Sequence, residues 1–345
     1  MKNLLTDIAG VRVGHAHDAT LASGVTAILF DKPAVASLDI RGGGPGTRDS
    51  ALLDPVNTVD GIDGIALAGG SAFGLDAAGG MQGWLAEQGR GFAIADAVIP
   101  IVPGAIVFDL LNGGNKKWGR FSPYRDLGYA AASTAGDDFA LGTVGAGFGA
   151  TTANFKGGLG SASAELPNGI RVAALAVVNA VGSVTVGDGP WFWSAPYEIG
   201  DEFGGHAMPA TFTDDMRAMR VKGAATATAI ENTTLVAVVT DALLTKAQAQ
   251  RLAMSAQTGF ARAIYPVHAP LDGDLVFAAA TGAKPIDPLY GLTELGTVAA
   301  NVVARAIARG VYEATALPFP DALPAWKDRF DRSQDRIHSR PNTSP

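Results

Sequence analysis

The chain alternates between short apolar runs and clusters of glycine and aspartate. In its first part, runs rich in β-branched residues are closed by turn residues, a pattern that is typical of β-strands. We therefore expect strands at 11–16, 24–30 and 35–41. A continuous apolar run at 65–70 predicts a buried strand, and the glycine turn and amphipathic pattern after it predict a helix.

The middle of the chain is less regular. Glycine interrupts almost every apolar stretch between residues 100 and 165, so periodicity defines no element there. Residues 171–184 are almost continuously apolar, as expected of a central strand. Residues 187–231 contain glycine, proline and aromatic clusters, which predict a long surface excursion.

The clearest periodicity follows this excursion. It predicts a strand at 233–242, an amphipathic helix at 245–264, another strand at 274–281 and a last helix at 292–314. Residues 319–345 are rich in proline and charge, with too little apolar surface to pack by themselves. We expect this segment to be a mobile tail.

Composition narrows the classes of protein that fit these elements. With 345 residues, 48% hydrophobic and 17% charged, the chain can bury a sizeable core, and we expect one domain over 1–345. A net charge of -7 argues against nucleic acid and membranes as partners and favours small molecules. The chain has no cysteine, no signal-peptide pattern and no apolar run of membrane-spanning length, so we expect a cytoplasmic protein.

Three patterns that often mark a catalytic or cofactor site do not hold here. Gly145, Gly147 and Ala150 match a dinucleotide-binding pattern, but no helix is predicted after them, so a tight turn is the better interpretation. Around Ser71, a serine-hydrolase elbow would need glycine where Phe73 stands. The five histidines form no dense metal-ligand set, and we expect neither a cofactor nor a metal.

The chemistry is indicated by motifs that occur in a fixed order. The run ENTTLVAVVTDA places two threonines before a hydrophobic strand, which by itself is ordinary. It becomes informative beside RGGGPGTRDSALLDP, LAGGSAFGLDAA, VGAGFGATTANFKGGLGSAS, AVVNAVG and LDGDLVFAAATG. From Leu5 to Ala316 the chain closely resembles the L-aminopeptidase D-amidase/D-esterase family, which includes β-aminopeptidases and nylon-oligomer hydrolases.

This resemblance implies a self-cleaving amide hydrolase of the N-terminal-nucleophile type, with an α/β (α+β) fold layered as an αββα sandwich. The precursor would cut itself between Asn232 and Thr233, and the fragments 1–232 and 233–345 would stay together in one domain. Thr233 would be the nucleophile, and its freed α-amine, with an unperturbed pKa of about 8, would serve as its base. The family also implies a homo-oligomer, a tetramer of processed pairs.

The resemblance assigns roles to three further polar residues. Asn179 matches the family's oxyanion-stabilising asparagine, whereas on the residues alone a buried amide that fixes a strand end is the preferred interpretation. Asp272 and Asp274 match paired acids of the nylon-oligomer hydrolases. Strand alternation would place both on one face, where they would orient the Thr233 amine or attract a substrate ammonium. For Asp272, a turn that uses Asp-Gly is the alternative.

Lysine and tyrosine positions separate this chain from the nylon-oligomer hydrolases. Lys156 matches a lysine of many relatives and would stabilise charge near the site. The catalytic lysine of the nylon-oligomer hydrolases falls on Asn154, and a tyrosine near their nucleophile falls on Phe108. These departures weaken the case for nylon oligomers and leave Thr233 unaffected. We therefore expect the protein to hydrolyse small peptides or amides, including substrates with a free amino end.

Two other functions are compatible with these motifs. An acyltransferase of the ornithine acetyltransferase type also matures at a threonine, but Ile230, Glu231 and Asn232 stand where its K-G-T would precede the nucleophile. A chain that keeps the fold without processing would be a non-catalytic binding or assembly protein. Product formation with and without an added amine acceptor identifies an acyltransferase, and the intact mass of the denatured chain identifies an unprocessed protein.

Overall fold

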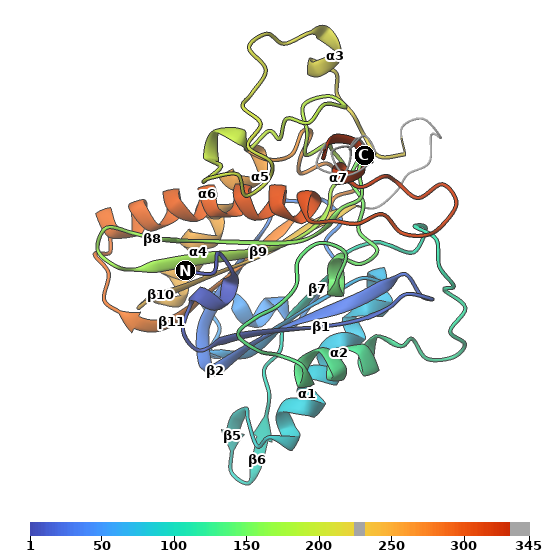
Figure 1. The fold of residues 1–345 in the computed structure, drawn as a ribbon. Helices are drawn as coiled ribbons and strands as arrows, with labels where there is room; N and C mark the ends of the chain where they lie inside the picture. The colour runs from blue at the N-terminus through green and yellow to red at the C-terminus, as the bar shows by residue number, and fades with distance from the viewer. Residues whose placement is uncertain (224–231, 332–345) are drawn as a thin grey trace, which may run out of the picture.

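The computed structural model describes residues 1–223 and 232–331 (Figure 1). Its strands are β1 (Val11–Asp18), β2 (Ser23–Ile40), β3 (Thr47–Arg48), β4 (Ile62–Ala68), β5 (Phe92–Ile94), β6 (Ala97–Ile99), β7 (Gly104–Ile106), β8 (Gly158–Glu165), β9 (Arg171–Asn179), β10 (Thr233–Ala242) and β11 (Leu275–Lys284). Its α-helices are α1 (Ala77–Glu87), α2 (Tyr124–Ser133), α3 (Asp214–Arg217), α4 (Lys246–Ala256), α5 (Thr258–Ala261), α6 (Tyr290–Tyr312) and α7 (Trp326–Phe330).

The long strand β2 joins two sheets at the centre of the molecule. Its first part pairs with β1 and β4, while its last part pairs with β11, as Ile40 does with Leu275. The strand order is β3-β7-β4-β2-β11-β10-β9-β8, with β1 also paired to β2. Strand β10 therefore lies between β11, which runs parallel to it, and β9, which runs antiparallel to it.

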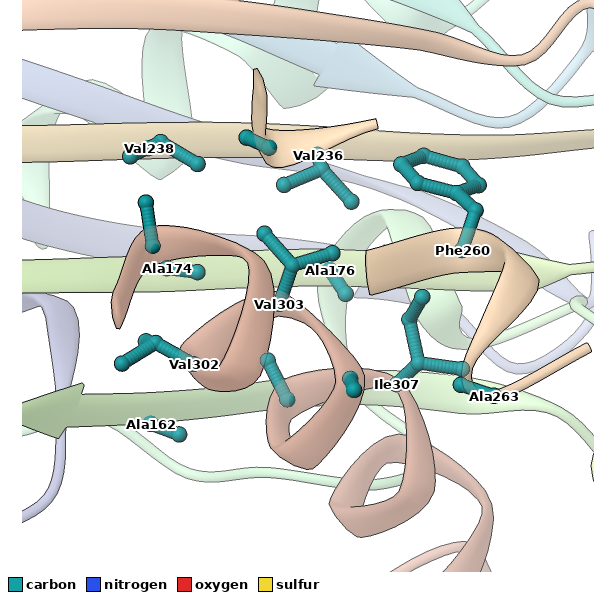
Figure 2. Close-up of a cluster of buried hydrophobic side chains, with 14 of the residues drawn as sticks. Ala162, Ala174, Ala176, Val236, Val238, Phe260, Ala263, Val302, Val303 and Ile307 are labelled. Carbon is teal, nitrogen blue, oxygen red and sulfur yellow. The ribbon is translucent and has the colours of Figure 1, made fainter. Parts of the chain in front are cut away.

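Three layers of apolar side chains hold the elements in an αββα stack. One lies between strands β8 to β11 and helices α4, α5 and α6, a second lies between the two sheets, and a third lies under α1 and α2. Figure 2 shows the first layer, where Val236 and Val238 of β10 lie opposite Val303 of α6. The layered α/β fold that the resemblance implied is confirmed.

Strand β10 is buried at every position. It has a neighbouring strand on each side and a packed layer of side chains on each face. Val236 and Val238 enter the layer under the helices, while Leu235 and Ala237 enter the layer between the sheets. Side chains of a strand alternate between its two faces, so both faces of β10 are covered by protein. Its first residue, Thr233, is therefore held on a strand with very little freedom to move.

Glycine lets α6, the longest helix, approach the sheet closely. A Cβ at Gly160 would come within 2.0 Å of the Ala306 carbonyl oxygen, so a larger residue would force strand and helix apart. This contact presses α6 onto β8 and β9 and fixes the strand that carries Asn179. Within the described ranges, no helix is long and apolar enough to cross a bilayer.

Several element boundaries differ from the predicted ones. The strands predicted at 24–30 and 35–41 are the single strand β2, whose middle residues Asp31, Lys32 and Pro33 are exposed. The pairing of β2 with β4 shifts register across this stretch, since proline has no N–H for the ladder. The helix predicted at 245–264 is divided into α4 and α5, and the strand predicted at 171–184 ends at Asn179.

The predicted excursion is irregular as far as it is described. Between residues 187 and 223, the regular structure consists of one 3₁₀ turn, Ala195–Tyr197, and the four-residue helix α3. In Figure 1 this helix and its flanking loops project beyond the helix layer. Residues 224–231 lie outside the described residues.

The prediction of a mobile tail over 319–345 is wrong for its first part. Trp326 of α7 is only 2% exposed, and its ring contacts those of Phe192 and Tyr312. The Pro324 carbonyl also accepts a hydrogen bond from the backbone N–H of Lys156 at 2.9 Å. One tryptophan buries enough apolar surface to anchor a short polar segment, which the average composition of the tail concealed. Residues 332–345 lie outside the described residues.

Candidate active site

The proposed nucleophile, Thr233, is the first residue of β10 and lies between the ends of two neighbouring strands. On one side it pairs with Asn179, the last residue of β9. On the other side lies Gly273, in the segment before β11. Thr233 is 3% exposed and Asn179 is 1% exposed. The register of the sheet thus places two of the predicted site residues side by side.

The peptide bond between Asn232 and Thr233 is held at both ends. The Thr233 hydroxyl donates a hydrogen bond to the Asn232 carbonyl oxygen, immediately before it in the chain. The same oxygen accepts a second hydrogen bond from the Gly273 N–H at 2.8 Å. The Asn232 N–H donates to the Leu271 carbonyl at 3.2 Å, so the turn before β11 fixes this peptide.

Gly273 is required at this place by the space that Thr233 occupies. A Cβ on residue 273 would lie 2.6 Å from Thr233 Oγ1 and 3.0 Å from the Gly44 carbonyl oxygen. Such distances are too short for an ordinary contact, so any larger residue would displace the threonine side chain. The glycine of the Asp-Gly-Asp sequence therefore has a steric reason that the sequence motif alone did not reveal.

The side chain of Asn179 is fixed by three hydrogen bonds. Its Oδ1 accepts from the Thr151 N–H at 3.0 Å and from Lys222 Nζ at 3.2 Å. Its Nδ2 donates to the Phe108 carbonyl oxygen at 3.0 Å. An amide nitrogen carries two hydrogens, so one remains for a further acceptor after Phe108 is satisfied.

Asp274 holds the start of β10 rather than the Thr233 side chain. Its Oδ1 accepts from the Thr234 N–H at 2.7 Å, and its Oδ2 lies 3.0 Å from His268 Nδ1. The His268 backbone N–H also donates to Oδ2, at 3.2 Å. The sequence therefore predicted that Asp274 lies near the proposed nucleophile, but it did not predict the contacts of Asp274 with Thr234 and His268.

Asp272 lies opposite Asn232, with which it forms a parallel bridge. Its Oδ2 accepts the Ala269 N–H at 2.7 Å, whereas its Oδ1 is buried and has no hydrogen-bond partner among the described residues. Burial, and then the neighbouring Asp274 carboxylate, raise the pKa of Asp272 to about 7. A carboxyl group with this pKa exchanges its proton near neutral pH.

Lys156 is buried in a cage of backbone carbonyls. Its Nζ donates to the oxygens of Gly147, Ala150 and Gly157 at 3.1, 2.8 and 2.7 Å. Burial lowers the pKa of Lys156 to about 7, against the attraction of the Asp109 carboxylate. All three ammonium hydrogens have backbone partners, so this geometry ties down the loop before β8.

Asn154, the other residue at the family's lysine position, forms hydrogen bonds with the segment after β9. Its Nδ2 donates to Thr185 Oγ1 and to the Gly187 carbonyl oxygen, both at 3.1 Å. These contacts tie the loop before β8 to the start of the excursion. Asn154 and Lys156 thus both have structural partners within the described chain.

A cavity of 280 Å³ adjoins Asn179. The three residues that hold the Asn179 amide, Phe108, Thr151 and Lys222, all line it, as do Lys156 and Asp109. Thr233 and Asn179 themselves are not among the lining residues in the uncut chain. The cavity wall is thus linked to Thr233 through Asn179 and the residues that hold its amide.

Comparisons with known proteins identify the family of this chain. A family model described as Peptidase family S58 matches residues 3–322. The chain belongs to peptidase family S58. An uncharacterized aminopeptidase of Mycobacterium tuberculosis is 43% identical, with 95% of this chain and 98% of the relative covered. A 6-aminohexanoate-oligomer endohydrolase of a Kocuria species is 27% identical, with 89% and 85% covered.

Solved structures share the fold of this S58 peptidase. A β-aminopeptidase of a Burkholderia species has a TM-score of 0.68 and 22% identity, with 99% of this chain and 96% of that chain covered. The L-aminopeptidase D-Ala-esterase/amidase of Ochrobactrum anthropi also has a TM-score of 0.68, with 19% identity and 96% and 95% covered. Its structure is described as a variant of the Ntn hydrolase fold. The S58 chain is thus a hydrolase that acts on peptide or amide bonds.

Two residues near the candidate site of this S58 peptidase carried no signal in the sequence. Lys222 belongs to the irregular excursion and matches no motif, yet it contacts Asn179. The spacing of His268 from other residues matches no known catalytic motif. It nevertheless contacts Asp274, and its backbone has a positive φ of 55°. An unusual backbone angle at a non-glycine residue is a common mark of a functional site, but it is visible only in the structure.

The patterns set aside in the sequence have structural explanations in this S58 peptidase. Gly145–Gly147 form a short 3₁₀ turn. His15 Nδ1 lies 3.0 Å from Thr26 Oγ1, and the ring of His17 stacks on Phe148. Among residues 1–223 and 232–331 there is no group of three or more His, Asp or Glu that could hold a metal ion.

Proposed function

We propose that this S58 peptidase cuts its own chain between Asn232 and Thr233 and then hydrolyses amide bonds in small peptides or amides through an acyl-enzyme on Thr233. The observation that carries the proposal is the contact at the bond itself, where the Thr233 hydroxyl donates to the Asn232 carbonyl oxygen. A hydroxyl held against the preceding carbonyl needs only a small movement to reach its carbon atom.

Self-cleavage would begin with attack of Thr233 Oγ1 on the Asn232 carbonyl carbon. The new ester bond replaces the bond from that carbon to the Thr233 nitrogen, and the hydroxyl proton passes to the departing nitrogen. The Gly273 N–H already points at the oxygen on which negative charge develops, so it supports this step. Water then opens the ester, which leaves a carboxylate on Asn232 and a free amine and hydroxyl on Thr233.

Hydrolysis of a substrate would use the same hydroxyl and the new amine. An α-amine has an unperturbed pKa of about 8, so its neutral form can take the hydroxyl proton during attack on a substrate carbonyl. Asp272 Oδ1 is buried beside the cut bond and has no partner among the described residues, which suits it to receive an N–H of that amine. The remaining N–H of Asn179 supports its assignment as an oxyanion donor.

The proposed substrates are small peptides or amides, including those with a free amino end. The cavity of 280 Å³ beside Asn179 suits a small ligand. The relative with 43% identity is named an aminopeptidase, which favours substrates that begin with an amine. Relatives named for 6-aminohexanoate oligomers are more distant, at 27% identity, and Phe108 and Asn154 depart from their pattern.

Replacement of the nucleophile tests the proposal. We expect Thr233→Val, which removes the hydroxyl and keeps a β-branched side chain on the strand, to give an uncut chain with no amidase activity. The control is Thr234→Val, because Thr234 Oγ1 is buried without a partner among the described residues. It should cut itself normally.

Intact mass under denaturing conditions and amino-terminal sequencing of the fragments measure the cut. A wild-type chain that remains whole while it is fully active would overturn the proposal. Addition of an amine acceptor to the assay separates hydrolysis, in which the product is the free acid, from acyl transfer to the amine.

A further inference from the structure

Lys222 is a half-buried cation beside the site, and the self-cleavage chemistry does not use it. Its backbone N–H donates to the Val181 carbonyl at 2.9 Å, which attaches it just beyond the end of β9. Its Nζ lies 3.2 Å from Asn179 Oδ1 and 3.5 Å from the Asn179 carbonyl oxygen, and the side chain lines the cavity. Removing an ammonium from water costs free energy unless it has partners, and within residues 1–223 and 232–331 the Nζ of Lys222 donates only to these two oxygens, so its placement calls for a role.

The contacts of Lys222 differ from those of Lys156, a fully buried lysine that lines the same cavity. Lys156 donates to three carbonyl oxygens, the longest of these bonds being 3.1 Å. Among the described residues, Lys222 donates to oxygens of Asn179 alone. The ammonium of Lys222 is thus directed at the residue proposed to stabilise the oxyanion, whereas that of Lys156 holds a loop.

The carbonyl group at the self-cleavage bond has its hydrogen-bond donors on a different side of the site from Lys222. The Asn232 oxygen accepts from the Gly273 N–H and the Thr233 hydroxyl, both on the β10 and β11 side of the site. Asn179 and Lys222 lie on the β9 side, next to the cavity. In each of the two reactions proposed for Thr233, negative charge would develop on a carbonyl oxygen. Different polar groups lie near that oxygen in the two reactions.

We propose that Lys222 is a positioning residue for the hydrolytic reaction alone, which holds the Asn179 amide in place and puts a positive charge beside the acyl-transfer site. The inference rests on the proposed function of Thr233. Because Lys222 and the Thr151 N–H both bind Asn179 Oδ1, the amide cannot turn over without losing two hydrogen bonds. Its Nδ2 is thereby kept available as a donor.

Several charged groups lie near Lys222 or line the same cavity. They are Asp272 from the turn before β11, Lys156 from the loop before β8, Asp109 from the loop after β7, and the Thr233 amine after cleavage. Burial lowers the pKa of Lys222 to about 7, against the attraction of Asp272. The positive charge is therefore present below pH 7 and is lost as the pH rises through this value.

The central experiment compares Lys222→Met with wild type. We expect the variant to cut itself as completely as wild type, while kcat for a small aminoacyl amide falls by about tenfold or more, because Asn179 loses its support. The matched control is Lys246→Met, since Lys246 likewise donates to two oxygens, the carbonyls of Leu52 and Asn57, and does not line the cavity. It should keep the wild-type kcat.

A second variant, Lys222→Arg, gives a readout that a merely structural role would not change. Arginine stays charged at all working pH values. The ratio of kcat for Lys222→Arg to kcat for wild type should therefore increase as the pH rises through about 7. The ratio cancels the titration of the Thr233 amine, which both proteins share, and it decides the question even if Lys222→Met does not fold.

The outcomes are distinct. An unchanged kcat in Lys222→Met, loss of self-cleavage in a folded Lys222→Met, or a pH-independent ratio for Lys222→Arg would each overturn the role of Lys222. In all three cases a cut and active wild type leaves the proposed function of Thr233 standing. An uncut but active wild type would instead remove the proposed function itself.

Discussion

Gly273 acts on the Asn232–Thr233 peptide both through its N–H and through its lack of a side chain. The N–H donates to the carbonyl oxygen before the cut, and the missing Cβ leaves room for Thr233 Oγ1. The backbone angle of Gly273 is one that other residues adopt, since it is not among the glycines with a positive φ. Its requirement for glycine is thus a matter of space alone.

Gly273→Ala should consequently slow self-cleavage without preventing folding. The new Cβ would lie 2.6 Å from Thr233 Oγ1 and push the hydroxyl away from the carbonyl. A displacement costing about 1–3 kcal/mol slows the reaction by about one to two orders of magnitude. The cut fraction is followed over time by denaturing gel electrophoresis. Gly44→Ala is the control, because its nearest neighbour would be 3.7 Å away, and equal rates for both variants would contradict this account.

The protonation of Asp272 links the site to stability. Burial raises the pKa of this carboxyl from its ordinary value of 3.8 to about 7. The folded chain then binds a proton that the unfolded chain has released, so stability decreases as the pH rises from about 4 to about 7. Above this window the Asp272 charge destabilises the uncut fold; below it the effect disappears.

Asp272→Asn should therefore stabilise the uncut chain at alkaline pH. Asparagine imitates the protonated carboxyl in shape but carries no charge. In a Thr233→Val background, which prevents cleavage, we expect the variant to have the higher Tm at pH 8 and an equal Tm at pH 4. Thermal unfolding at both values measures this. A Tm difference of the same size at pH 4 and pH 8 would rule out titration of Asp272 as its cause.

At the scale of elements, the apolar pattern predicted strands and helices that were either apolar throughout or clearly two-faced. The strand at 233–242 and the last helix have clear patterns because each packs one face on a single layer or is buried throughout. The two strands around Asp31, Lys32 and Pro33 looked separate because exposed polar residues normally end a strand. Here the chain continues, since β2 passes from one sheet to the other at this point.

The candidate site was predictable only where a motif carried it. Thr233, Asn179, Asp272 and Asp274 lie together at neighbouring strand ends, in line with their motifs. Lys222 was not predictable, because a lone lysine in an irregular segment has no periodicity that could place it. Asp274 binds the Thr234 N–H through a contact that depends on strand register, which residue spacing does not determine.

For the whole molecule, the order of strands predicts how the two proposed fragments behave. The second fragment contributes the adjacent strands β10 and β11, and these lie between β9 and β2 of the first fragment. Each fragment thus lacks the neighbours that complete its half of the sheet. Exposed strand edges and apolar faces make either fragment unstable alone.

We therefore expect the cut fragments to remain together under native conditions. Size-exclusion chromatography should give one peak that contains both fragments, at the elution volume of uncut Thr233→Val. Denaturing gel electrophoresis of that peak should then give two bands. Separation into two native peaks, or fragments that fold when expressed alone, would contradict the interleaved arrangement.

The interleaving of β10 and β11 also has a kinetic consequence. Before the cut, the chain folds in an intramolecular process whose rate does not depend on dilution. After the cut, a denatured molecule becomes two separate polypeptides that must find each other again, so its recovery slows with dilution. The continuous chain would then be needed only for the first folding. The lifetime of the mature protein would depend on how slowly it unfolds, because refolding from separate fragments is inefficient.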